Sequence, residues 1–157
     1  MRIRALLAAS ALAGVLAAAA TASAAAATIT TATVNGTEVP PISSTLGTFV
    51  GVAGKPLRAS WRVQIDHQPL ATGPTVAITG GSYSFLTLSR RILSGPVTGG
   101  SVTVVDRGSH CANQTYEVSL QLAGGSFDGT LTHHRRSLLG RCVLYAATIH
   151  GRATLTG

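Results

Sequence analysis

Charged and aromatic residues are both scarce in this sequence of 157 residues. Only 11% are Asp, Glu, Lys or Arg and only 4% are Phe, Trp or Tyr, whereas 45% are hydrophobic. This composition excludes a disordered, collagenous or coiled-coil protein. The length is that of a single domain.

Several chemistry-bearing motifs are also missing. There is no G-x-S-x-G nucleophile motif, no phosphate-binding loop and no dinucleotide fingerprint, so no catalytic triad and no cofactor are expected. The adjacent His133 and His134 point to opposite faces of a strand, so they cannot hold one metal ion, and no metal site is expected. Without an aromatic stacking array, the sequence also argues against a nucleic-acid partner.

The first 27 residues have the pattern of a secretory signal peptide. Arg2 and Arg4 precede an apolar, alanine-rich run, and the small-x-small sequence at residues 22–24 fits a signal peptidase. The run is shorter than the ~20 residues that span a bilayer, and no later stretch could span as a helix. We therefore expect cleavage of residues 1–24 and secretion of residues 25–157 as a single monomeric domain without a membrane span.

Alternation with a period of two predicts strands in the mature chain. Leu57, Ala59, Trp61, Val63 and Ile65 alternate with polar residues, which is typical of a half-buried strand. Residues 116–122 and 143–149 alternate in the same way, and residues 28–34 and 46–53 also favour strands. No window has helical periodicity, so the fold class is all-β.

A Gly-Gly-Ser sequence recurs three times, and each copy is predicted to form a hairpin turn because two glycines readily adopt positive φ. The copies lie within residues 79–82, 98–101 and 123–126. With Gly124-Gly125 as the loop, Leu122 faces Phe127 and Tyr116 faces His133. The paired faces match at all three sites, as a specified register requires.

Three such hairpins would send residues 82–89, 101–106 and 126–134 in the same direction. The connections that follow them would then share one end of the molecule and gather most of the arginines there. The molecule is therefore predicted to be electrically polar, with a positive arginine-rich end and an uncharged end at the glycine turns. The residues of the arginine-rich end are Arg90, Arg91, Arg107, His110, Arg135, Arg136 and Arg141.

Cys111 and Cys142 are the only cysteines. In a secreted chain they are expected to form a disulfide, which would close over the end of the strand 126–134 and stiffen the arginine-rich end. Two cysteines without C-x-x-C spacing make a poor zinc motif.

The fold is expected to be a small antiparallel up-and-down barrel of eight or nine strands, and a two-sheet sandwich is the alternative. Most aromatic residues fall on the inferred inner face, which favours a packed interior. Tyr116 and His133 are expected near the barrel mouth, where they are weak candidates for an acid–base pair. The preferred interpretation of the two residues is a hydrogen-bonded pair that closes the core.

Two functions follow. The first is a non-enzymatic binding module whose arginines engage an anionic polymer, such as a cell-envelope component, or an acidic protein surface, because guanidinium groups bind carboxylates and phosphates with two hydrogen bonds. The alternative is a small barrel enzyme or ligand carrier that uses Tyr116 and His133.

Overall fold

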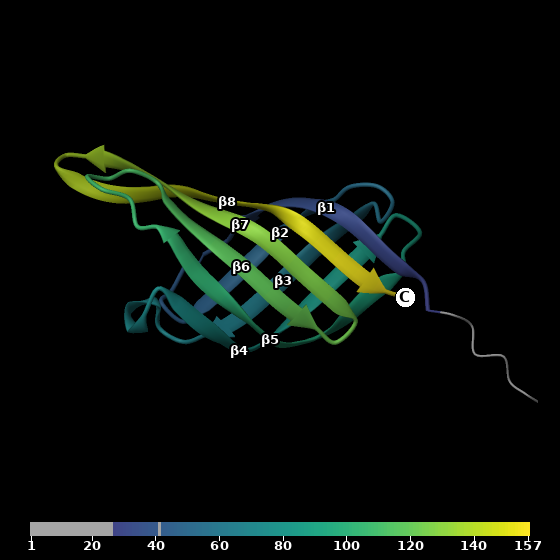
Figure 1. Ribbon diagram of the computed structural model, residues 1–157. Coiled ribbons are helices and arrows are strands. Elements are labelled where there is room, and N and C mark those ends of the chain that lie inside the picture. Colours follow the sequence, from purple (N-terminus) through teal and green to yellow (C-terminus); the bar gives the residue numbers. More distant parts are fainter. Residues whose placement is uncertain (1–26, 41) are drawn as a thin grey trace, which may run out of the picture.

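The chain forms a closed barrel of eight antiparallel strands in a computed structural model, which describes residues 27–40 and 42–157 (Figure 1). The predicted signal peptide, residues 1–24, lies outside the described residues. Each strand pairs with its neighbours in sequence, and β1 closes the barrel on β8. The strands are β1 (Ile29–Glu38), β2 (Leu46–Ala53), β3 (Ala59–His67), β4 (Thr75–Thr87), β5 (Ile92–Asp106), β6 (Gln114–Leu122), β7 (Gly125–Leu138) and β8 (Arg141–Thr156).

The barrel confirms the predicted fold class and decides against the sandwich. A single 3-10 turn, η1 (Leu70–Thr72), lies between β3 and β4. Among the described residues, none of the helical segments is long and apolar enough to cross a bilayer.

The interior is filled by the side chains that the alternation assigned to the inner face. Trp61 is 3% exposed, and its ring centroid lies 6.3 Å from that of Phe85 and 5.6 Å from that of Phe127. An eight-stranded barrel is just wide enough for side chains to fill its centre. The packed interior therefore leaves space for a ligand only toward an end of the barrel.

Two of the three Gly-Gly pairs do not form turns, which corrects the hairpin prediction. Gly80-Gly81 lies inside β4, opposite Asp66 and Ile65, and Gly99-Gly100 lies inside β5. Both pairs adjoin register shifts in the sheet. The third pair is near a real turn, but the loop is Ala123-Gly124.

The three copies nevertheless share one backbone role. The second glycine has a φ of 138° at Gly81, 131° at Gly100 and 147° at Gly125. At each position a Cβ would collide with a backbone carbonyl of the neighbouring strand. Glycine there lets a strand bend while it stays paired, as a small barrel requires. The recurrence in the sequence thus marks a repeated backbone element, which adjoins a bulge at Gly81 and Gly100 and a hairpin turn at Gly125.

The observed register of the β6–β7 hairpin differs from the predicted one by two residues. Leu120 lies opposite Phe127, and Tyr116 lies opposite Leu131. A shift of two residues keeps every side chain on its predicted face, since the side-chain period is two. For this reason the predicted inner face is right although the partners are wrong.

Because β4 and β5 each run through their glycine pairs, the connections alternate between the two ends of the barrel. We call the end with connections 39–45, 68–74, 107–113 and 139–140 the hairpin end. The terminal end carries connections 54–58, 88–91 and 123–124 together with Gly157, and the C-terminus is marked there in Figure 1.

Candidate functional site

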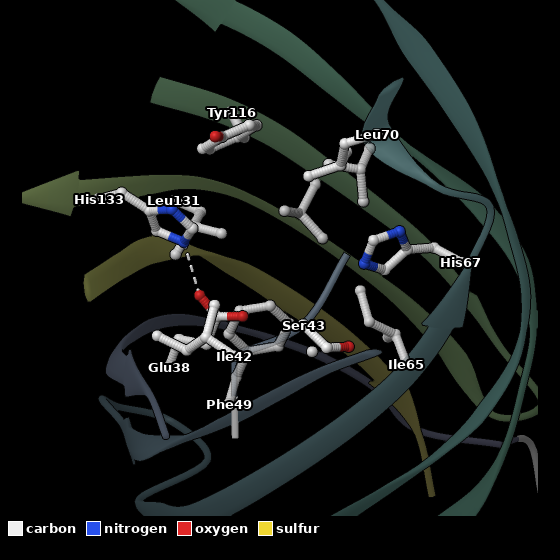
Figure 2. Close-up of a pocket in the computed structure, with 13 residues that line it drawn as sticks. Glu38, Ile42, Ser43, Phe49, Ile65, His67, Leu70, Tyr116, Leu131 and His133 are labelled. Atoms are coloured by element: carbon white, nitrogen blue, oxygen red, sulfur yellow. Dashed lines mark hydrogen bonds and ion pairs between the residues drawn. The ribbon is translucent and has the colours of Figure 1, made fainter. Parts of the chain in front are cut away.

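A small cavity of about 30 Å³ opens at the hairpin end (Figure 2). A water molecule needs about 10–15 Å³ on this scale, so the space suits one or two waters or the end of a larger molecule. Its walls are mostly apolar, and four of its polar side chains come from four different strands. These four are Glu38, His67, Tyr116 and His133.

Glu38 and His133 form a hydrogen bond at the cavity. Glu38 Oε2 lies 2.7 Å from His133 Nε2, and the two side chains are only 5% and 12% exposed. β8 separates their strands, so the two backbones are about 10 Å apart. Ala147 of β8 pairs with His133, and its small side chain leaves room for the two long side chains to meet across it.

Tyr116 packs against the His133 ring, with 5.0 Å between the ring centroids. Its hydroxyl donates a hydrogen bond of 3.2 Å to Gln114 Oε1. Burial raises the pKa of the Tyr116 phenol, and the Arg135 guanidinium opposes that rise. Tyr116 is therefore a neutral hydrogen-bonding group at physiological pH.

His67 faces the cavity from the side opposite His133 (Figure 2). Its Nδ1 donates a hydrogen bond of 2.8 Å to the carbonyl oxygen of Gln68, which can only accept. In the neutral ring this fixes Nε2 as an acceptor. The cavity thus combines an imidazole acceptor on one side with the Glu38 carboxylate on the other.

The prediction of Tyr116 and His133 at the barrel mouth fits this geometry, with one correction. Gln114, rather than Tyr116, lies directly opposite His133, and Tyr116 reaches the ring from a diagonal position. Sequence reasoning missed Glu38 and His67. Period-two alternation continued from Trp61 through Ile65 places His67 on the inner face, but no local pattern indicates the barrel closure that brings Glu38 to His133.

The predicted arginine cluster is divided between the two ends. Arg107, Arg135, Arg136 and Arg141 lie at the hairpin end, as does His110. Arg90 and Arg91 lie at the terminal end, close to Arg58, whose carbonyl accepts a hydrogen bond from Leu88 N. The expectation of a single arginine-rich end is wrong because the bulges at Gly80-Gly81 and Gly99-Gly100 do not reverse the chain.

Four of the basic residues therefore lie at each end, with Lys55, Arg58, Arg90 and Arg91 at the terminal end. The molecule is not electrically polar in the predicted sense. The two ends differ instead in the local backbone structure that carries the arginines.

The β7–β8 hairpin projects beyond the rest of the barrel (Figure 1). β6 pairs with β7 only as far as His133, and β1 pairs with β8 only from Thr148 onward. Residues 134–147 form a two-stranded ribbon that extends about 17 Å, or five residues at ~3.4 Å each. Arg135, Arg136 and Arg141 lie on this projecting ribbon.

The β5–β6 connection braces the ribbon along its length. The predicted disulfide is present and joins Cys111 to Cys142, with 5.3 Å between their Cα atoms. Asn113 Oδ1 accepts a hydrogen bond of 3.2 Å from Arg135 N. A two-stranded ribbon alone is marginally stable in water, so these contacts hold it in place.

The chain matches no protein-family model, and no curated protein or solved structure matches it. Among the described residues, no group of three His, Cys, Asp or Glu side chains could hold a metal ion. The cavity and the projecting β7–β8 ribbon, both at the hairpin end, are the candidate functional sites.

Proposed function

We propose that this protein is a non-enzymatic, secreted binding module that engages an anionic partner through its projecting ribbon. The residues that bind are Arg135, Arg136 and Arg141, with Arg107 on the neighbouring connection. The observation that carries the proposal is the ribbon itself, which presents three guanidinium groups on a braced element that extends away from the barrel.

Local electrostatics support this assignment. No acidic residue occurs from residue 129 to the end of the sequence. Within residues 27–40 and 42–157 the only carboxylate within ion-pair distance of a basic side chain is that of Glu38, beside His133, so none of the four arginines is paired with a carboxylate there. Their guanidinium groups are available for two-pronged hydrogen bonds to phosphate or carboxylate groups of a partner.

Two adjacent arginine pairs provide a matched test. The double substitutions R135S/R136S and R90S/R91S remove the same charge from opposite ends of the barrel. We expect the wild-type protein to bind a heparin column, used as an anionic polymer. R135S/R136S should elute at clearly lower salt, and R90S/R91S should elute near the wild-type position. Equal retention of the two variants would show that only net charge matters, and failure of the wild type to bind would refute the proposal.

The cavity supports a second candidate, a site for a small ligand. The specific observation is that His67 Nε2 and the Glu38 carboxylate face the same mostly apolar space, where both can accept hydrogen bonds. A ligand that donates a hydrogen bond from an otherwise apolar body complements such a site. The volume of about 30 Å³ restricts entry to the hydroxyl-bearing end of the molecule.

Phenol is a suitable probe for this second candidate, because its hydroxyl donates and its ring is apolar. During a titration followed by NMR, the imidazole resonances of His67 and His133 should shift together and saturate. The resonances of His150, on the outside of the barrel, serve as an internal control. Unchanged His67 resonances would exclude the cavity as a binding site for this class of ligand.

A further inference from the structure

The tip of the ribbon presents a leucine in an unfavourable setting. Leu138 pairs with Arg141, so Leu139 and Gly140 form a two-residue turn with φ values of 51° and 79°. Turns with two positive φ values favour Asn-Gly or Asp-Gly, and a leucine at the first position is disfavoured by its Cβ. Leu139 is also 97% exposed, and Leu138 is 51% exposed.

Leu139 therefore combines a strained backbone with an apolar side chain in water. Its near-complete exposure leaves little contact with the barrel to compensate for either. Strain that the surrounding structure does not explain is a reason to look for a function. An exposed apolar tip is explained by a partner that removes it from water.

Behind the tip lies a collar of cationic and aromatic side chains. Arg135, Arg136 and Arg141 lie on the two strands behind the tip. The Arg136 guanidinium lies 5.2 Å from the centroid of the Tyr145 ring. Tyr145 is 56% exposed. Counted back from the tip, the leucines are followed by the three arginines and then by Tyr145. An apolar end backed by cationic side chains fits the acyl boundary and the anionic headgroups of a bilayer.

We infer that the anionic partner of the ribbon is a lipid surface with negatively charged headgroups, into which Leu138 and Leu139 insert. This inference rests on the proposed function and names its partner. Charge complementarity favours this occupant, because the three arginines beside the leucines would lie at the level of lipid phosphates. The Cys111–Cys142 bridge keeps the ribbon ordered before contact, so that less conformational freedom is lost on binding.

The terminal end offers a control, because it also carries exposed leucines and arginines but on a different local structure. Two exposed leucines lie there beside Arg90 and Arg91, Leu86 near the end of β4 and Leu88 in the β4–β5 connection. That connection is held against its neighbour by the hydrogen bond from Leu88 N to Arg58 O, and it forms no projecting ribbon. A comparison of the two sites therefore distinguishes the effect of the projecting ribbon from the effect of the residue types alone.

The experiment measures co-sedimentation with vesicles that contain equal amounts of phosphatidylglycerol and phosphatidylcholine. Vesicles of pure phosphatidylcholine, which have no net charge, serve as the control. We expect the wild type to bind the anionic vesicles and to bind the uncharged ones much more weakly. L138S/L139S should lower the anionic-vesicle affinity by about tenfold or more, since two leucines no longer leave water. R135S/R136S should lower it by about fivefold per arginine. L86S/L88S and R90S/R91S should bind as the wild type does.

Retention on heparin, measured on the same variants, distinguishes the two proposals. L138S/L139S should be retained as strongly as the wild type, because a polymer in water offers the leucines no apolar phase. Heparin retention without vesicle binding would overturn the lipid inference and leave the proposed function intact. Equal vesicle binding by L138S/L139S and the wild type would overturn insertion. If the wild type binds neither heparin nor anionic vesicles, both proposals are overturned.

Discussion

Glu38 and His133 lie 95 positions apart in sequence, yet Glu38 Oε2 is 2.7 Å from His133 Nε2. The contact crosses β8 above Ala147 and joins β1 to β7. It therefore depends on the strand pairing that closes the barrel. This pair links the cavity to the stability of the closed fold.

Loss of the Glu38 carboxylate should destabilise the barrel. We expect Glu38→Ala to lower the free energy of unfolding by about 2 kcal/mol at pH 7, because a buried, charge-assisted hydrogen bond is lost. Glu38→Gln should cost about half as much, since its amide oxygen can still accept from His133. Urea denaturation followed by the fluorescence of Trp61, the only tryptophan, measures both. An alanine variant as stable as the wild type would show that the pair contributes nothing.

Adjacent glycines should differ sharply in their tolerance of a side chain. At Gly100 the φ of 131° and the carbonyl oxygen of Ser119 both oppose a Cβ, whereas at Gly99 a Cβ meets only the flexible Gln121 side chain at 3.3 Å. We expect Gly100→Ala to destabilise by about 2–3 kcal/mol and Gly99→Ala by less than about 1 kcal/mol. Thermal unfolding of the two variants compares them. Similar losses of stability in the two variants would contradict a special backbone role for Gly100.

Removal of the disulfide should loosen the ribbon before it loosens the barrel. The bridge joins residues 31 positions apart, so C111S/C142S should lose about 4 kcal/mol of stability in the chain-entropy treatment. Native-state hydrogen exchange should show faster exchange in residues 135–138 and 143–146, while residues 118–122 keep their slow exchange relative to the ribbon. Unchanged protection of the ribbon amides would show that Asn113 and strand pairing suffice to hold it.

Tyr116 should make stability fall at high pH. Its pKa in the folded protein is raised above the ordinary value of 10.0 by burial, with Arg135 in opposition. Above pH 10 the unfolded chain releases this proton before the folded protein does, so unfolding is favoured as the pH rises. The contribution is intact below pH 10 and is lost as the pH rises through the folded-state pKa.

The check for this effect is the free energy of unfolding measured from pH 8 to pH 11. Tyr116→Phe should show a shallower decline above pH 10 than the wild type does. Tyr145→Phe, which changes an exposed tyrosine, should keep the wild-type slope. A Tyr116→Phe curve parallel to the wild-type curve would rule out Tyr116 as the source.

Local patterns were sufficient for some of these features. The alternation around Trp61 and that from Tyr116 to Leu122 identified inward-facing residues, which are buried in the barrel. Cys111 and Cys142 were correctly paired, because two cysteines allow one intramolecular bridge. The position of Tyr116 and His133 near the mouth also followed from the face and the direction of their strands.

Other features required long-range pairing. A glycine with positive φ fits a turn and a bulge equally well, so the sequence around Gly81 or Gly100 could not tell whether the chain reverses there. That choice placed Arg90 and Arg91 at one end and Arg135 and Arg136 at the other. The carboxylate partner of His133 was hidden for a related reason, since it depends on how β1 meets β8.

The sequence by itself determined the all-β class, the inner face of the strands and the disulfide, because a period of two and the number of cysteines are properties of the chain alone. Only the tertiary structure decided where strands end, which side chains meet across the barrel and which arginines project with Leu139. Those outcomes depend on the register between strands and on barrel closure, which are set by pairing energies between segments far apart in the chain.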